Sequence, residues 1–170
     1  MPDVSATIYG ERSFTHAQTL DQVARLAASL PTYEVGSGDR VAILALNSDR
    51  YYQLLYATAW SGAVVVPVDI RWSANEIAYS LVEAEVRTLV VDDAFQPLTA
   101  AVRDLTPDLQ TLIHCGDLDT PPDMLSWETL VAEADPIPDA QRRGDDLAGI
   151  FYTSGTTVLS QGRHALVVWG

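Results

Sequence analysis

The chain has 170 residues, 48% of them hydrophobic, so it is long enough for one well-buried core and too apolar for a disordered segment. Its 23 acidic side chains outnumber the 10 basic ones and give a net charge of -13, which argues against a nucleic-acid partner because such a surface repels phosphates. The single cysteine, Cys115, excludes an internal disulfide and favours a cytoplasmic location, and the longest apolar run is too short for a transmembrane segment.

The N-terminal segment predicts a hairpin followed by a helix. It lacks the basic and apolar regions of a signal peptide, so we expect no targeting sequence there. β-prone runs at residues 6–9 and 13–15 flank Gly10-Glu11 and predict a small hairpin. A helix should begin at Thr15, a good N-cap residue, and end before Pro31, because apolar residues recur at helical spacing. These apolar residues are Leu20, Val23, Ala24, Ala27 and Leu30.

Strand-like and helix-like segments then alternate. Apolar runs typical of buried parallel strands occupy residues 41–46, 63–68, 87–91 and 111–114. The predicted helices between them begin at Asn47-Ser48-Asp49, at the capping box of Ser73 and Glu76, and near Phe95. The alternation implies right-handed crossovers, so the predicted fold class is α/β, with an open, mostly parallel sheet and helices on both faces.

The segment after the fourth strand is different in composition. Residues 116–146 are rich in Asp and Pro, which predicts a surface excursion with one short helix over the apolar patch at residues 124–131. Residues 147–152 then form a strand that leads into a loop. Near the C-terminus, the apolar run at residues 165–169 allows a terminal strand.

The loop after residue 152 carries the clearest chemical pattern. Five small residues follow the strand, and successive N–H donors in a tight glycine-containing turn can cradle anionic oxygens. The sequence therefore predicts a phosphate site, although Ser, Thr and Gly are also typical of an ordinary polar loop. The candidate residues are Thr153, Ser154, Gly155, Thr156 and Thr157.

Four segments of the chain match motifs of one known enzyme family, in the family's order. The run 152–157 resembles the Y-T-S-G-T-T core of its phosphate-binding loop, and residues 38–48 resemble G-D-R-V-A-I-L-x-x-N-S. Residues 62–68 are similar to G-A-V-x-V-P-x, and residues 70–79 look like a stretch of fatty-acid–CoA ligases. The chain thus resembles the N-terminal part of the adenylate-forming, or AMP-binding, superfamily of the acyl-CoA synthetase type.

The resemblance implies an ATP-dependent acid–thiol ligase. In such enzymes a carboxylate, here of the fatty-acid class, reacts with ATP to give an acyl-adenylate, and coenzyme A then displaces AMP; Mg²⁺ is required. It implies that residues 153–157 hold ATP phosphates and that residues 1–157 are one α/β subdomain. The family's adenine pocket, acyl tunnel, magnesium carboxylate and C-terminal lysine would lie beyond Gly170, so we assign no catalytic or metal-binding residue and expect the chain alone to be inactive.

A non-catalytic module is the alternative function. A subdomain that normally packs against others should expose apolar surface when it stands alone, and this would favour partner binding or homo-oligomer formation.

The tail at residues 158–170 departs from the family pattern. The family's loop continues T-T-G-x-[PS]-K-G, whereas this chain has Val158 in place of the glycine and Gln161 in place of the lysine. Loss of the lysine removes a positive charge beside the triphosphate and predicts weaker ATP binding. The codons CAA GGG CGT CAT GCT CTC for residues 161–166 would read Lys-Gly-Val-Met-Leu after loss of one base, so we hypothesise a frameshift; sequencing of the coding DNA tests it. This shift does not explain Val158.

Other polar and aromatic residues have structural interpretations. Asp39 and Arg40 are expected at a turn and a sheet edge, rather than as a catalytic dyad. The pairs Asp92-Asp93 and Asp145-Asp146 are interpreted as solvated acidic pairs, with a metal role as the lesser alternative. Trp72 and Trp127 are expected to pack in or over the core.

Overall fold

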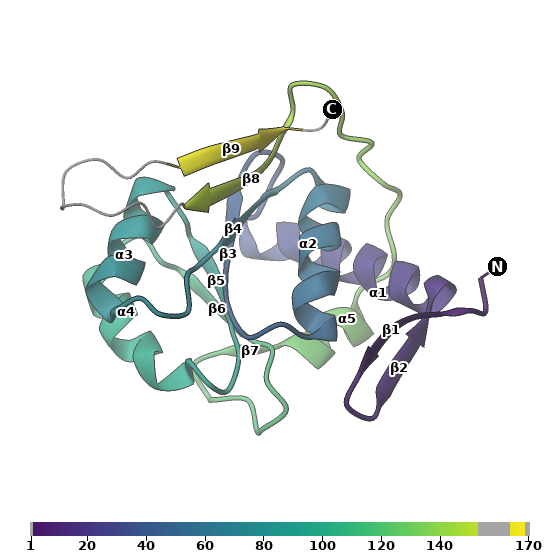
Figure 1. The fold of residues 1–170 in the computed structure, drawn as a ribbon, viewed down its shortest axis with the longest axis horizontal. Helices are drawn as coiled ribbons and strands as arrows, with labels where there is room; N and C mark the ends of the chain where they lie inside the picture. Colours follow the sequence, from purple (N-terminus) through teal and green to yellow (C-terminus); the bar gives the residue numbers. More distant parts are fainter. Residues whose placement is uncertain (1, 153–163, 169–170) are drawn as a thin grey trace.

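A computed structural model describes residues 2–152 and the backbone of residues 164–168. The chain begins with an antiparallel hairpin and continues as a sheet with helices on both faces (Figure 1). The helices are α1 (His16–Ser29), α2 (Asp49–Ser61), α3 (Ala74–Glu83), α4 (Thr99–Leu105) and α5 (Trp127–Glu133). The strands are β1 (Ser5–Tyr9), β2 (Arg12–Thr15), β3 (Arg40–Leu44), β4 (Val64–Pro67), β5 (Thr88–Val91), β6 (Thr111–His114), β7 (Leu125–Ser126), β8 (Leu147–Tyr152) and β9 (His164–Val168).

The main sheet confirms the predicted fold class. Its strands lie in the order β7-β6-β5-β3-β4-β8-β9 within the described part of the chain. Neighbours from β7 to β8 pair in parallel, and β9 pairs antiparallel with β8. The β9 strand lies in the tail segment for which the sequence allowed a terminal strand, while the frameshift origin of that tail stays a hypothesis.

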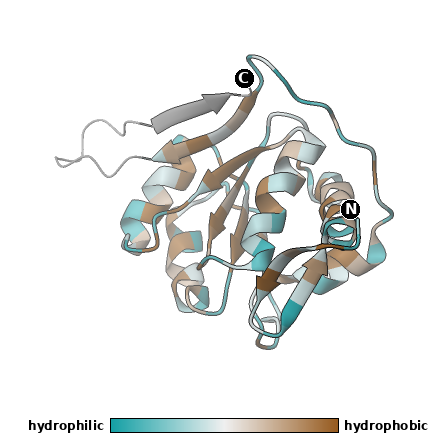
Figure 2. Cartoon of the chain, turned by 45° about the vertical axis from the view of Figure 1, so that its right-hand side comes forward, coloured by the Kyte–Doolittle hydropathy of each residue, from teal (hydrophilic) through white to brown (hydrophobic). Residues whose placement is uncertain are grey.

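Two apolar layers cover the sheet, one on each face. Side chains that alternate along β3 point to opposite layers: Val41 and Ile43 belong to the layer with α1, α2 and α5, and Ala42 and Leu44 to the layer with α3 and α4. Figure 2 shows the central strands as the most hydrophobic part of the chain. This burial on both faces explains why the strands appear in the sequence as continuous apolar runs. None of the helices in residues 2–152 has the length and apolar character needed to cross a bilayer.

The helix starts follow the local chemistry that the sequence predicts. The Thr15 hydroxyl accepts a hydrogen bond from the Gln18 N–H, and the Gln18 side-chain oxygen accepts one from the Thr15 N–H, which completes a capping box. Ser73 and Glu76 form the same box at α3. At the end of α2, Gly62 has a φ of 82°, a left-handed conformation that glycine adopts without strain.

Some local expectations were wrong. Leu20 lies on the solvent side of α1 with 53% of its surface exposed, because the buried stripe runs through Thr19, Val23 and Leu26 instead. The excursion contains β7 ahead of its helix, and two residues are too short for a strand pattern to appear. A 3-10 turn at Gln96–Leu98, with Pro97 near its start, precedes α4, so the α-helix begins at Thr99 rather than near Phe95.

The structural interpretations of three further residues are confirmed. Asp39 accepts a hydrogen bond from the Gly36 N–H at 2.8 Å and so closes the turn before β3. Arg40 donates to the Ala84 carbonyl at 2.7 Å and thereby ties the start of β3 to the end of α3. Trp127 is 3% exposed within the layer of α1 and α2.

Candidate functional site

The carboxyl ends of β3, β4 and β8 meet at one edge of the sheet. After β3 the chain crosses to the face of α1 and α2, whereas after β4 it crosses to the opposite face, where α3 lies (Figure 1). The β5 strand then pairs with the other side of β3. The strand order therefore reverses around β3, and the carboxyl end of β3 is a topological switch point, the place where open α/β sheets bind ligands.

A hollow of about 280 Å³ lies at this switch point. Residues that directly follow the two strands form its walls, and Tyr51 of α2 completes it. Burial raises the pKa of Tyr51, so its phenol stays protonated and can donate a hydrogen bond at neutral pH. The strand-following residues are Ala45, Leu46 and Asn47 after β3, and Val68, Asp69 and Ile70 after β4.

Asp69 is the carboxylate of this hollow. Its Oδ1 accepts the Arg71 backbone N–H at 3.0 Å, and its Oδ2 accepts from the Arg71 guanidinium at 2.6 Å. These hydrogen bonds lower the pKa of Asp69 to about 2. Asp69 therefore stays ionised at neutral pH and holds the loop between β4 and α3 in a tight turn.

The Asp92-Asp93 pair after β5 is not the solvated acidic pair that we expected. Asp92 accepts the Leu46 N–H at 2.7 Å and so fastens the loop after β3 to the end of β5. Asp93 accepts the Asp117 N–H at 2.6 Å and bonds the buried His114 ring at 2.8 Å. Both carboxylates act as loop anchors because backbone N–H groups point at them.

The second acidic pair, Asp145-Asp146, is only partly the solvated pair that we expected. Asp146 accepts the Arg143 N–H at 3.1 Å and forms an ion pair with Arg142 at 3.2 Å, whereas Asp145 is exposed. Within residues 2–152, no group of three or more His, Cys, Asp or Glu side chains converges in a way that could hold a metal ion.

The predicted phosphate-loop residues, 153–157, lie outside the described residues. The structure does describe the strand that leads to them, since β8 is parallel to β4, pairs Gly149 with Val65, and ends at Tyr152. This end therefore lies at the same sheet edge as the hollow. The strand that precedes the predicted residues thus ends at this edge, beside two loops that the motif alone did not identify.

Tyr152 anchors this end of β8. Its hydroxyl donates to the Ser80 carbonyl of α3 at 3.0 Å, and its ring meets Trp72 edge-on, with centroids 5.8 Å apart. Burial, followed by the neighbouring Glu83, raises the pKa of Tyr152. The contact with Trp72 also confirms Trp72 as a residue that covers the core.

We expect Tyr152→Phe to lower the free energy of unfolding by about 1 kcal/mol, because the Ser80 carbonyl loses a partner while the ring contact stays. Urea unfolding followed by circular dichroism measures the change. Tyr9→Phe is the matched control, since Tyr9 is 39% exposed and water can solvate its hydroxyl. Equal effects of the two substitutions would contradict the anchoring role.

Comparisons with known proteins give a consistent result. The sequence model of the family described as "AMP-binding enzyme" matches residues 1–162. A peroxisomal butyrate–CoA ligase of Arabidopsis thaliana is 35% identical over 95% of the chain and 31% of its own length. A long-chain-fatty-acid–CoA ligase of Thermus thermophilus is 36% identical over 87% of the chain and 27% of its own length.

Solved structures agree on the fold. The anthranilate CoA ligase AuaEII, in complex with anthranoyl-AMP, superposes with a TM-score of 0.91 at 22% identity, over 98% of this chain and 32% of that one. A fatty acyl CoA synthetase of Mycobacterium tuberculosis gives a TM-score of 0.76 at 26% identity, over 92% and 29%. The chain thus spans about a third of the length of these similar proteins.

Proposed function

The chain belongs to the AMP-binding enzyme family, and from that premise we propose that it supplies the triphosphate-holding part of an acid–CoA ligase. In the proposed reaction a carboxylate oxygen attacks the α-phosphorus of ATP, the bond to the leaving pyrophosphate breaks, and an acyl-adenylate forms. The sulfur of coenzyme A then attacks the acyl carbon, and AMP leaves. The role of this chain is to hold the phosphates with the hydroxyl and N–H donors of residues 153–157.

The position of the end of β8 carries this proposal. The strand ends at Tyr152, at the sheet edge where loops from β3 and β4 form a hollow. A phosphate-binding loop in this place would have the ligand between three strand ends, as open α/β sheets generally do.

The names of the relatives support a proposal for the substrate class. Their names specify butyrate and long-chain fatty acids, so we propose a carboxylic acid, with fatty acids as the first candidates. Mg²⁺ accompanies ATP in this proposal, but the described residues offer no cluster that fits it. A chain that spans about a third of its relatives is expected not to complete the reaction alone. We propose a cytoplasmic location, although some relatives are peroxisomal.

We expect the chain to bind ATP weakly, and the variant Val158→Gly with Gln161→Lys to bind it about tenfold more tightly, because an ammonium returns beside the triphosphate. Calorimetric titration with ATP and magnesium chloride measures both affinities. Gln110→Lys adds the same charge at an exposed position far along the sequence and should leave the affinity unchanged. If the control tightens binding equally, the effect comes from net charge and the assignment of the loop fails.

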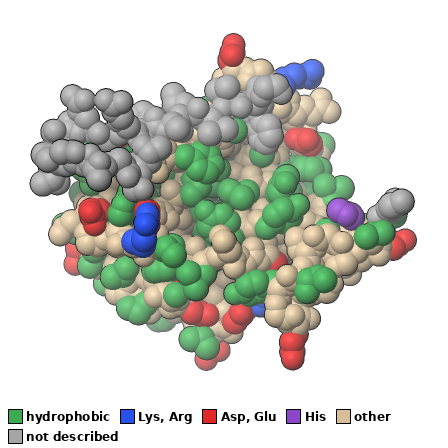
Figure 3. All heavy atoms as spheres, in the orientation of Figure 1, with side chains coloured by type: hydrophobic (Ala, Val, Ile, Leu, Met, Phe, Trp, Pro, Cys, Tyr) green, Lys and Arg blue, Asp and Glu red, His purple; other side chains and the backbone are tan. Residues whose placement is uncertain are grey.

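A second function, partner binding or self-association, is favoured by exposed apolar side chains near the hollow. Leu46 and Ile70 are 46% and 43% exposed, and Tyr52 and Tyr56, whose rings contact each other at a tilt of 51°, are 38% and 49% exposed. Figure 3 shows apolar side chains gathered on this face of the molecule. Calorimetric titration with ATP separates the functions, because a ligase part binds ATP and a module for partner binding does not. A pyrophosphate-exchange assay beside it tests the expected inactivity, since exchange catalysed by the chain would show it to be active alone.

A further inference from the structure

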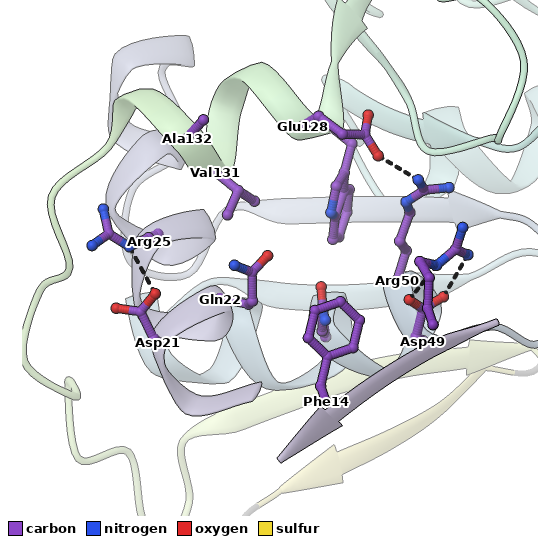
Figure 4. A pocket seen from close by; sticks show the side chains of 12 residues that line it. Phe14, Asp21, Gln22, Arg25, Asp49, Arg50, Glu128, Val131 and Ala132 are labelled. Carbon is purple, nitrogen blue, oxygen red and sulfur yellow. Dashed lines mark hydrogen bonds and ion pairs between the residues drawn. The ribbon is translucent and has the colours of Figure 1, made fainter. Parts of the chain in front are cut away.

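A second cavity lies away from the switch point, on the face of the molecule that carries α1, α2 and α5. Its volume is about 510 Å³, and its walls come from β2, α1, the first turns of α2, and α5 (Figure 4). Apolar side chains form part of the wall: Phe14, Trp127 and Val131. The sheet edge that holds the proposed ATP site is formed by other residues, so the two hollows have no lining residue in common.

Gln53 lines this cavity, and its side-chain amide has a donor without a hydrogen bond within the described part of the chain. The residue is 2% exposed, and its Nε2 has no hydrogen-bond partner among the described residues. An unpartnered buried donor costs about 1 to 3 kcal/mol. Gln53 lies one turn after Asp49 on the inner face of α2, where its neighbours Leu54 and Ala57 are apolar. A polar side chain in this position therefore suits a ligand that offers it a hydrogen-bond acceptor.

The charges around the cavity are already paired. Arg12 donates to both oxygens of Asp49 at 2.8 Å, and Arg50 forms an ion pair with Glu128 (Figure 4). Asp117 accepts from both arginines. Arg25 and Asp21 form one more lining pair, so three guanidinium groups face four carboxylates. An anionic ligand therefore gains no net attraction here, and a cationic one would have to compete with the arginines.

We propose that this cavity binds a small uncharged molecule that presents a carbonyl oxygen to the Gln53 amide and a flat apolar group to Phe14 and Trp127. Neutral aromatic amides are the simplest members of this class. Aromatic side chains favour a flat partner, and a carbonyl oxygen gives the Gln53 donor its missing hydrogen bond without bringing a charge.

Three probes of the same shape test the proposal: benzamide, benzoate and benzylammonium. Each is titrated into the isotope-labelled chain, and NMR follows the side-chain amide of Gln53 and the indole N–H of Trp127, with the indole of Trp60, which donates to the Ile137 carbonyl, as internal reference. Benzamide should shift the Gln53 and Trp127 signals saturably and leave Trp60 unchanged. The two charged probes should bind at least about tenfold more weakly.

The variant Gln53→Leu provides the second arm. It removes the donor and keeps the volume similar, so benzamide affinity should fall about tenfold while the melting temperature does not drop. Gln110→Leu, at an exposed position, is the matched control and should bind benzamide like the unchanged chain. The proposal is overturned if benzamide causes no saturable shift, if benzoate binds as well as benzamide, or if Gln53→Leu binds benzamide with unchanged affinity.

Discussion

Replacing Arg12 with alanine should lower the free energy of unfolding by about 2 to 3 kcal/mol, because it leaves a buried carboxylate without its counter-ion. Asp49 has 2% of its side chain exposed and receives two hydrogen bonds from Arg12, each 2.8 Å long. The pair joins the hairpin to the first turn of α2. Arg12 itself is 30% exposed, and the N-terminus of α2 also stabilises the Asp49 charge, so the effect should fall below that of a fully buried pair.

Urea unfolding of Arg12→Ala and of Arg71→Ala measures this effect against a matched control. Arg71 also forms a two-pronged pair, with Asp69, but 74% of its side chain is exposed. Surface ion pairs contribute little, so Arg71→Ala should have almost no effect on the unfolding free energy. A small effect of both substitutions would mean that the burial of Asp49 does not control the stability of the hairpin contact.

The elements that the sequence predicted well are those with a local physical cause. The caps of α1, α2 and α3 depend on Thr15, Ser48 and Ser73, each of which bonds a backbone N–H three residues later. The strands β6 and β8 have the predicted bounds, because a strand buried on both faces is a continuous apolar run with polar residues at its ends.

The predictions that failed concern residues whose partners lie far away in the sequence. Asp93 was interpreted as solvated because nothing near it in the chain indicates a partner, yet it bonds His114 and the N–H of Asp117. Arg12 and Asp49 are similarly distant. Topology, rather than local pattern, brings these groups together, and a single sequence does not reveal it.

The candidate site, too, could be predicted only in part from the sequence. The sequence identified residues 153–157 from their composition, and these lie outside the described residues. It did not identify the hollow at the ends of β3 and β4, although the signal was present: Asn47 and Asp69 each follow a buried strand closely, and the ends of parallel strands meet at one edge. The Gln53 cavity carried no such signal, since a lone glutamine within a helix is ordinary.

Gly116→Ala should also destabilise the fold strongly, by about 2 to 3 kcal/mol. A Cβ atom at this position would come closer than 3.0 Å to the carboxylate carbon and both oxygens of Asp93. Hydrogen bonds hold that carboxylate in place: it bonds the ring of His114, which is 2% exposed, and accepts from the N–H groups of Asp117 and Leu118. The methyl group must therefore break at least part of this network.

Gly36→Ala is the control for this substitution, since its Cβ would meet Asp39 at an ordinary 3.4 Å and the change in unfolding free energy should fall within about 0.5 kcal/mol.

The pH dependence of the unfolding free energy gives a further test. Hydrogen bonds from Asp117 and His114 outweigh burial and lower the pKa of Asp93, so its contribution is complete above the unfolded pKa of about 4 and disappears as the pH falls through the lower folded value. The deficit of Gly116→Ala in urea unfolding should therefore shrink in acid; a deficit of the same size at every pH would show that the methyl group acts by crowding alone, without breaking the bonds of Asp93.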